Sequence, residues 1–368
     1  MNNQPLHIVH TEASCGWGGQ EIRILSEATG LRDRGHRVEL LCPGDAPIFS
    51  AARDLGLTAT ALDIGKKNLP GLSALRDWLK RHPKVDILNT HSSTDSWLSA
   101  IACKSLSNSP VMVRTRHISA AVPGNIPTRW LYTRASRHIV TTGEKLRRTL
   151  IEDNRFPGEN ITSVPTGVDP EIYRPGDKIA VRKILNLPID TPVIGIVATL
   201  RSWKGHQYLL EAVKKLNRPD LLLLIVGDGP YRSKIDLAIE NLGISHQVRL
   251  VGNQKEVTPW LQTMDLLALP SWANEGVPQS ILQAMMCALP VISTPVGSIE
   301  EAVINGETGA IIPEKDAGAL AAAIAELLDH PEHAQALGEA GLKRAHDHFS
   351  RENMLNRMEG IFSDLARG

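Results

Sequence analysis

The sequence predicts an α/β protein made of two doubly wound domains, each with a parallel sheet. Short β-rich apolar runs alternate with helical patterns along the 368 residues, and this alternation is typical of parallel sheets with right-handed crossovers. The runs are continuously apolar, as expected for strands covered on both faces. Some thirteen runs are present, which is too many for one comfortable sheet. Two domains of about 170 residues fit this pattern better.

The first half of the chain is expected to form seven strands. The helix predicted after the first strand has apolar residues at Ile22, Leu25, Ala28 and Leu31, and Gly35 ends it. The strands are predicted at residues 6–11, 37–42, 58–64, 85–91, 111–117, 138–143 and 161–167.

The second half repeats the alternation. Helices are expected at residues 206–217, 280–288 and 317–328. A Pro- and Gly-rich stretch at 167–178 predicts a boundary between domains 1–172 and 173–349. The strands are predicted at residues 193–199, 221–227, 247–252, 266–270, 291–296 and 308–313.

Composition narrows the functional class. The chain is 42% hydrophobic and 22% charged, and its 40 basic residues balance 40 acidic ones, which argues against a general nucleic-acid binder. The four cysteines lie among apolar neighbours without a CxxC pair and are predicted to be free, buried thiols. Neither a signal peptide nor a membrane-spanning run is visible, so a cytoplasmic protein is expected.

The loop after the first strand, residues 14–21, is a candidate anion site. Its glycines allow close approach to an anion, and a helix starting near Gly19 offers unpaired N–H groups. A dinucleotide fingerprint would need Gly or Ala where Glu21 stands, and a carboxylate would repel pyrophosphate, which disfavours an NAD site. A tight turn without a ligand is the structural alternative.

Two loops of the second half also carry candidate groups. Arg201 and Lys204 lie between a predicted strand and a helix, where two cations suit a diphosphate, although a solvated surface pair is equally open. Asp228 is more typical of a turn cap than of chemistry, and Pro230 suits a first helical position. No Asp-x-Asp pair or His/Cys cluster has metal-ligand spacing, so no metal site is predicted.

A lone carboxylate, Glu275, follows the strand predicted at 266–270. It precedes Gly276 and a helix start near Pro278, so it can accept hydrogen bonds from hydroxyl groups beside free backbone N–H donors. His91 and His117 each end a strand in the first half. One such histidine is usually structural, but two at one sheet edge favour at least one ligand contact.

These segments together resemble the GT-B retaining glycosyltransferases of family 4. The resemblance rests on "GWGGQE", "THSS", "TRH", "VPTGVDPEIYRP", "KGHQYLLEAV", "VGDGP", "EGVPQSILQAM" and "TPVGSIEEAV", which cover nearly the whole chain in order. It implies two Rossmann-like domains facing a central cleft. The N-terminal domain would bind the acceptor, the C-terminal domain would bind a nucleotide-sugar, and the last helix, 350–368, would pack back on the first domain.

The resemblance also implies roles for individual residues. Glu275 would hold hydroxyls of the donor sugar, Lys204 would pair with the diphosphate, and His117 would lie near the reacting sugar. Arg201 completes the predicted catalytic set, and Trp17 and His91 are placed on the acceptor side. The predicted donor-binding residues are Gly18, Gly19, Thr199, Gly252, Asn253, Gly276, Val277, Pro278, Gln279 and Gln283.

Two positions depart from the family pattern. Thr199 stands where the family usually carries Arg, a charge that Arg201 can supply. Gln283 stands where the family has a second Glu that binds the nucleotide ribose. The predicted activity is metal-independent, retaining transfer of a hexose-type sugar, without a cofactor, in cell-envelope polysaccharide or lipopolysaccharide synthesis. The alternatives are a nucleotide-sugar epimerase or hydrolase and a degenerate sugar-nucleotide-binding homologue.

The predicted acceptor domain is the more basic of the two. The first 173 residues of the chain hold 21 basic and 17 acidic residues, against 19 and 23 in the remainder. Basic residues concentrate at 127–148, with Trp130 and Tyr132 among them. This pattern favours binding at the inner face of an anionic membrane and a glycan or lipid-linked acceptor, with an ordinary solvated helix face as the alternative.

Overall fold

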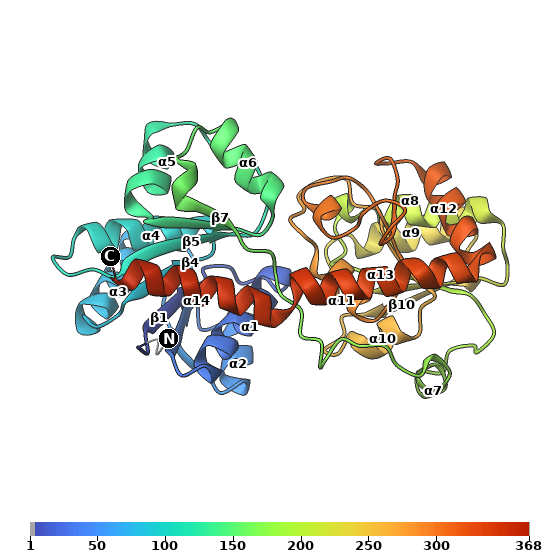
Figure 1. Ribbon diagram of the computed structural model, residues 1–368, viewed down its shortest axis with the longest axis horizontal. Helices are drawn as coiled ribbons and strands as arrows, with labels where there is room; N and C mark the ends of the chain where they lie inside the picture. Colours follow the sequence, from blue (N-terminus) through green and yellow to red (C-terminus); the bar gives the residue numbers. More distant parts are fainter. Residues whose placement is uncertain (1–3, 368) are drawn as a thin grey trace. The chain divides into compact units, whose positions relative to one another are not determined.

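The computed structural model describes residues 4–367, which form two compact units (Figure 1). The first unit comprises the described residues up to Gly167 and from Arg351 onward, and the second comprises Val168–Ser350. Residues 1–3 and 368 of the predicted domain ranges lie outside the described residues. The division comes earlier than residue 172 because Val168 belongs to the second unit. Its N–H donates to Phe349 O at 2.9 Å, and it bridges to Ser350.

The first unit contains a seven-stranded parallel sheet in the order β3-β2-β1-β4-β5-β6-β7. Chain order reverses between β1 and β4, which makes this the switch point of the sheet. The strands are β1 (His7–Thr11), β2 (Arg37–Cys42), β3 (Thr58–Ala61), β4 (Ile87–Thr90), β5 (Val111–Arg116), β6 (His138–Thr141) and β7 (Ile161–Ser163).

The helices of this unit include the last helix of the chain, α14 (Arg351–Arg367), which packs against α1 (Gly19–Asp33) (Figure 1). The packing is close, because a Cβ added at Gly30 would lie 2.4 Å from Leu355 Cδ1. The others are α2 (Pro47–Asp54), α3 (Leu69–Arg81), α4 (Ser93–Lys104), α5 (Ile126–Trp130), the π-helical η1 (Leu131–Ala135), α6 (Glu144–Glu152) and the 3₁₀ turn η2 (Gly158–Asn160).

The buried face of α1 differs from the predicted one. Ile22 is 37% exposed, whereas Arg23 and Glu27 are fully buried. Arg23 Nη1 donates to Val164 O at 2.7 Å, and its Nε lies 3.6 Å from Glu27 Oε2. Glu27 is buried against the sheet, where Asn89 of β4 donates to it, and Arg23 is buried against Met358 of α14, so both polar side chains must find partners inside.

The second unit contains a six-stranded parallel sheet in the order β10-β9-β8-β11-β12-β13. Its switch point lies between β8 and β11. The strands are β8 (Val193–Val197), β9 (Leu222–Val226), β10 (Val248–Gly252), β11 (Leu266–Leu269), β12 (Val291–Ser293) and β13 (Ala310–Ile311). All thirteen predicted runs thus contain a strand, and the prediction of two doubly wound parallel sheets is confirmed.

Helices follow the strands of the second unit as the sequence predicts. The prediction that Pro230 takes the first position of a helix is wrong, because α9 begins at Arg232. The helical elements are α7 (Lys178–Ile184), η3 (Ser202–Lys204), α8 (His206–Leu216), α9 (Arg232–Leu242), η4 (Ser245–Gln247), α10 (Thr258–Gln262), α11 (Gln279–Met286), η5 (Ile299–Glu301), α12 (Ala317–Asp329) and α13 (Pro331–Phe349).

Two predictions about side-chain exposure are corrected. All four cysteines are free, but only Cys42 and Cys287 are buried. Cys103 is half-buried, and Cys15 is exposed because it lies in the glycine-rich loop rather than in the core. The aromatic residues of the basic segment turn inward. Tyr132 is 4% exposed and stacks on Phe156, while Trp130 stacks on Trp97. Tyr132 belongs to a core cluster, and the partly buried Trp130 packs against it. The large apolar side chain exposed beside this segment is Ile126, at 85%.

Candidate functional site

The switch point of the second unit brings two predicted site loops together. In open α/β sheets, ligands bind beyond the carboxyl ends of the strands where chain order reverses. The loop after β8 carries Arg201 and Lys204, and the loop after β11 carries Glu275. Because β8 and β11 are parallel neighbours, both loops emerge at the same edge of the sheet.

Lys204 and Glu275 form an ion pair at this edge. Lys204 Nζ donates to Glu275 Oε1 at 2.6 Å, and their side chains are 19% and 5% exposed. Ser271 Oγ donates to the same carboxylate oxygen at 2.7 Å. The second carboxylate oxygen, Oε2, is thus left to accept hydrogen bonds from another molecule, and the ammonium is poised beside it for an anion.

Two glycines make this close approach possible. Gly205 has φ +78°, and a Cβ there would lie 1.9 Å from Pro270 O at the end of β11. Gly297 has φ +60°, and a Cβ there would lie 2.1 Å from Glu275 O. A larger residue at either position would displace backbone, so glycine sets where Lys204 and Glu275 sit.

Arg201 lies elsewhere in the same loop. Its side chain is exposed, with the guanidinium 5.6 Å from the ring centroid of Trp203. Trp272 Nε1 donates to Ser202 O at 3.0 Å, which ties this loop to the one after β11. The structure therefore gives Glu275 the ammonium of Lys204 as its cationic partner and leaves Arg201 toward solvent.

The remaining predicted donor residues lie around these loops. Gly276, Val277 and Pro278 are buried ahead of α11, whose N-terminus no side chain caps. Gln279 is the first helical residue, so backbone N–H groups of the first turn remain open to oxygen ligands. Gln283 is 6% exposed, and its Nε2 donates to the Tyr173 hydroxyl at 3.0 Å.

Thr199, Gly252 and Asn253 are more peripheral. Thr199 is half-buried just after β8, and Asn253 is exposed after β10. Gly252, with φ +71°, accepts a hydrogen bond from Gly227 N at 2.8 Å. Asp228 accepts from Gly229 N at 2.7 Å, which agrees with the turn role predicted for it.

The glycine-rich loop of the first unit holds a buried carboxylate. Glu21 is 5% exposed, and burial raises its pKa, while hydrogen bonds from its own N–H, the Gly18 N–H and the Ser14 hydroxyl favour the charged form. This carboxylate occupies the N-terminus of α1, where a dinucleotide would place its pyrophosphate. Gly18 and Gly19 begin the helix as predicted, and Trp17 is 40% exposed beside them.

A second carboxylate, Glu12, was not predicted as a site residue. It is fully buried just after β1, and its two oxygens accept from Ser14 N at 2.7 Å and from Gln20 Nε2. Burial, reinforced by the nearby charge of Asp95, raises the pKa of Glu12 to about 8. Its place directly after a core strand was the available signal, but the strand end alone did not reveal the burial.

Replacing Glu12 with Gln is expected to make stability less dependent on pH. Between its ordinary pKa of 4.5 and about 8, the folded protein retains a proton at Glu12 that the unfolded chain has released. Stability from this group therefore falls as pH rises. Glu12→Gln should melt at a higher temperature than the parent near pH 8.5, with the difference vanishing near pH 5. Exposed Glu152→Gln is the control, and equal pH profiles for parent and Glu12→Gln would refute the assignment.

His117 and His91 lie side by side at the first sheet, with a third histidine behind them. His10 Nδ1 lies 2.9 Å from His91 Nε2, and His91 Nδ1 lies 2.9 Å from His117 Nε2. His91, which the resemblance placed on the acceptor side, is 4% exposed, and both of its ring nitrogens have imidazole partners. An acceptor-side role for it stays a prediction. His117 retains exposed surface.

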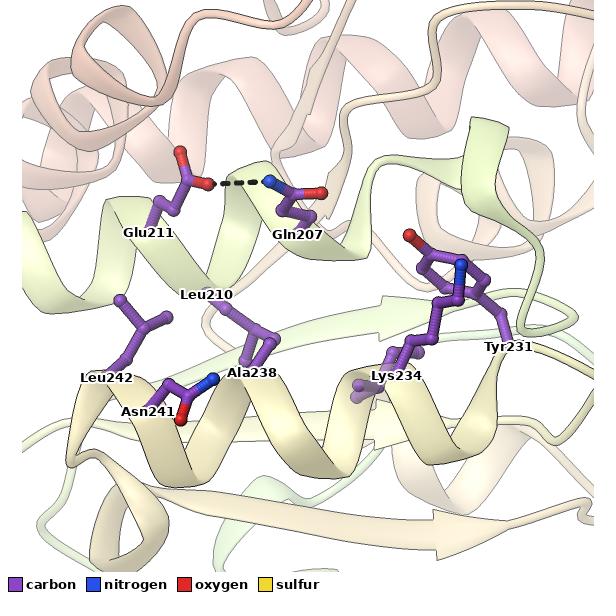
Figure 2. A pocket seen from close by; sticks show the side chains of 9 residues that line it. Gln207, Leu210, Glu211, Tyr231, Lys234, Ala238, Asn241 and Leu242 are labelled. Carbon is purple, nitrogen blue, oxygen red and sulfur yellow. Dashed lines mark hydrogen bonds between the residues drawn. The ribbon is translucent and has the colours of Figure 1, made fainter.

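A separate pocket lies away from the strand ends. It has a volume of about 260 Å³ and lies between α8 and α9 (Figure 2). Gln207 and Glu211 on α8 are hydrogen-bonded at 3.0 Å across from Lys234 and Asn241 on α9. None of the predicted site residues lines it, because they follow strands whereas this pocket lies between covering helices.

No group of three or more His, Cys, Asp or Glu side chains within residues 4–367 is arranged to hold a metal ion. No helix in that range is long and apolar enough to cross a membrane.

Comparisons with known proteins agree on one family. The sequence profile described as "Glycosyltransferase Family 4" matches residues 17–172, and that described as "Glycosyl transferases group 1" matches residues 177–344. The D-inositol 3-phosphate glycosyltransferase of Thermobispora bispora is 29% identical, with 89% of this chain and 86% of that protein covered. The N-acetyl-alpha-D-glucosaminyl L-malate synthase of Bacillus anthracis is 29% identical over 57% of this chain and 55% of its own length.

Solved structures show the same fold. A glycosyltransferase from Rickettsia africae superposes with a TM-score of 0.87 at 21% identity, with 98% of both chains covered. HepE from Anabaena, solved with UDP-glucose, also has a TM-score of 0.87, at 18% identity over 97% of this chain and 99% of that one. The profiles, the relatives and the two doubly wound sheets place this chain among the GT-B glycosyltransferases of family 4.

Proposed function

We propose that this glycosyltransferase moves a hexose-type sugar from a nucleoside diphosphate sugar to an acceptor, with retention of the anomeric configuration. The observation that carries the proposal is the Lys204–Glu275 pair, 2.6 Å apart at the switch point of the second sheet. A carboxylate with one oxygen free suits sugar hydroxyls, and an ammonium beside it suits a diphosphate. The complex of HepE with UDP-glucose supports a UDP-sugar as the first donor to try.

The charges account for the proposed chemistry. Departure of the nucleoside diphosphate builds negative charge, which Lys204 and the N–H groups of Gly276 to Gln279 are proposed to stabilise. Arg201 is exposed beside Trp203 and would have to turn toward the diphosphate to contribute. This stabilisation requires no metal, so activity should survive a chelator. Retention follows from the family resemblance, and NMR of the product's anomeric proton tests it. Gly18, Gly19 and His117 are proposed to contribute from the first unit.

The acceptor is proposed to be a glycan or a lipid-linked molecule of the cell envelope, as in polysaccharide or lipopolysaccharide synthesis. The exposed basic side chains of the segment 127–148 support binding of the first unit to an anionic surface, such as a membrane that carries the acceptor. The relatives from Thermobispora bispora and Bacillus anthracis are named for inositol 3-phosphate and L-malate. These small anionic molecules should therefore be tested as acceptors beside the glycans and lipids.

The proposal is tested in two steps. Thermal shift with UDP, GDP, ADP and their sugars identifies the donor, since a ligand at 100-fold its dissociation constant stabilises by about 2.7 kcal/mol. The donor is then incubated with and without acceptors, and products are identified by mass. Transfer to an acceptor supports the proposal. A donor altered without an acceptor indicates an epimerase or hydrolase, and binding without any product indicates a degenerate homologue.

Replacing Gln283 with Ala is expected to weaken donor affinity about tenfold, with a smaller effect on turnover. Because Gln283 Nε2 donates to Tyr173, its carbonyl oxygen stays free to accept a ribose hydroxyl. Gln283→Glu should bind donor equally or slightly more tightly, since a carboxylate accepts stronger hydrogen bonds and Tyr173 can donate to it. Calorimetry with the donor measures all three proteins.

Tyr173→Phe is the matched control for this prediction. It removes the partner that orients the amide of Gln283 but leaves the amide itself, so an intermediate loss of affinity is expected. Should Gln283→Ala bind the donor as well as the parent does, Gln283 merely packs in α11 and the ribose is held elsewhere.

The basic segment is expected to bind anionic vesicles at low salt. Arg129, Arg134, Arg137, Lys145 and Arg148 are exposed along it, and each basic residue near an anionic surface contributes about 1 kcal/mol. Co-sedimentation should show a preference for phosphatidylserine vesicles over neutral ones that added salt abolishes. A variant with Arg134 and Arg137 changed to Gln should sediment less, and a parent that binds both vesicle types equally would contradict the membrane proposal.

A further inference from the structure

Three imidazoles form a hydrogen-bonded chain across the first sheet. They come from three adjacent parallel strands: His10 from β1, His91 from the residue after β4, and His117 from the residue after β5. Both nitrogen–nitrogen contacts measure 2.9 Å, and the ring centroids are 5.2 Å apart at each step. The innermost ring, His10, is fully buried, and His117 is partly exposed.

All three rings are held neutral. Burial, followed by the positive charge of Arg23, lowers the pKa of His10 to about 3. Burial, with the adjacent imidazoles and Arg23, holds the pKa of His91 well below its ordinary value. Burial, with Arg23 and Arg114, does the same to the pKa of His117. A neutral imidazole has one N–H donor and one acceptor nitrogen, so each contact in the chain needs one ring to donate and the next to accept.

These constraints leave two possible directions of hydrogen-bond donation along the three histidines. If His10 carries its proton on Nδ1, it donates to His91 Nε2. His91 must then carry its proton on Nδ1 and donate to His117 Nε2. If His10 carries its proton on Nε2, every donor and acceptor reverses.

The environment of His10, the most deeply buried of the three histidines, selects between the two directions. His10 Nε2 has no hydrogen-bond partner among the described residues and is shielded from solvent. A proton there would be a buried N–H without a partner, in a ring that already feels the positive charge of Arg23. An unpaired lone pair at the same atom costs less, because under-used acceptors are tolerated inside proteins more often than orphaned N–H groups. The first direction is therefore the more stable, and it places the proton of His117 on Nδ1.

We infer that His10 and His91 are positioning residues that lock His117 as the Nδ1–H tautomer, so that it presents a hydrogen-bond donor and no basic nitrogen to the substrate. Nδ1 of His117 has no partner among the described residues, whereas its Nε2 lies 2.9 Å from His91 Nδ1, from which it accepts in the first direction. His117 thus suits an oxygen of the sugar or phosphate and cannot act as a general base. This inference rests on the proposed function for the identity of the substrate, but not for the tautomer.

Nitrogen-15 NMR of the full-length, histidine-labelled protein tests the tautomer without any substrate. Long-range proton–nitrogen correlations near pH 7.5 should show Nδ1 protonated in His10, His91 and His117. His10→Leu removes the donor that sets the direction, and His117 should shift toward Nε2–H. His10→Asn retains an N–H near the position of Nδ1, so His117 should keep the parental pattern. His138→Gln, on the neighbouring strand β6, serves for assignment and control.

Kinetics test the positioning role separately. With the donor identified as above, His10→Leu should lower kcat about tenfold with little change in KM, the lower range for partners that orient a working group in metal sites, and His10→Asn should recover most of it. Nε2–H at His117 in the parent would overturn the inference whatever the activity. A correct tautomer with unchanged kcat in His10→Leu would refute the positioning role and leave the glycosyltransferase proposal standing. Should His10→Leu not fold, the parent spectrum and His10→Asn still decide.

Discussion

Replacing Lys204 with alanine is expected to lower turnover by about 10²–10³-fold, the scale seen when one preorganised donor is lost from an active site. The ammonium lies 2.6 Å from Glu275 at the switch point, where the departing diphosphate is proposed to develop charge. Because the contact strengthens as that charge grows, kcat should fall more than donor affinity. Initial rates at saturating donor measure the effect, and circular dichroism verifies the fold.

Lys214→Ala is the matched control for the Lys204 variant. Lys214 is an exposed lysine of α8, the helix that follows Lys204, and its loss changes the net charge by the same amount. It should retain parental turnover. A Lys204→Ala variant that also turns over within twofold of the parent would remove Lys204 from the reaction.

Glu275→Gln is expected to impair turnover on a similar scale, about 10²–10³-fold, with the fold intact. The amide matches the carboxylate in shape and can still accept from Ser271, but it loses the charge that aligns sugar hydroxyls and Lys204. Exposed Glu300→Gln, after β12, is the control. If circular dichroism shows that Glu275→Gln unfolds, Glu275 is a structural residue and the sugar role fails.

The two variants should affect free nucleoside diphosphate in opposite ways. Lys204→Ala removes the cation that pairs with the diphosphate, so UDP, or whichever diphosphate binds the parent, should bind more weakly. Glu275→Gln removes a competing anion from Lys204, so the same diphosphate should bind equally or more tightly, while the nucleotide-sugar loses a hydroxyl acceptor. Calorimetry with both ligands separates the diphosphate role from the sugar role.

The strand–helix order was readable from the sequence because it depends on local patterns. Continuous apolar runs bounded by glycines and prolines gave thirteen strands in the right places, and helix starts at Gly19 and after Pro278 followed from the same rules. The predicted loops at strand ends carried Lys204 and Glu275. Their 2.6 Å contact was not readable, because it depends on β8 and β11 being neighbours although β9 and β10 intervene in sequence.

The sequence patterns failed mainly in predicting which polar and aromatic side chains are buried. Arg23 and Glu27 look like the solvent side of an amphipathic helix, but Arg23 is buried against Met358 of α14 and Glu27 against Asn89 of β4. Trp130 and Tyr132 look like interfacial aromatics, but Tyr132 belongs to a core cluster and Trp130 packs against it. In each case the deciding neighbour lies far away in the chain, so no window of sequence around the residue contains it.

The sequence by itself determined the fold class, the family and the loops that carry the candidate chemistry, because periodicity, glycine placement and motif order are local properties. Only the tertiary structure decided which of those residues meet. It paired Lys204 with Glu275, turned Arg201 onto Trp203, and aligned His10, His91 and His117 in one hydrogen-bonded chain. The physical reason is that parallel strands distant in sequence become neighbours in a sheet, and side chains at their ends then share one edge.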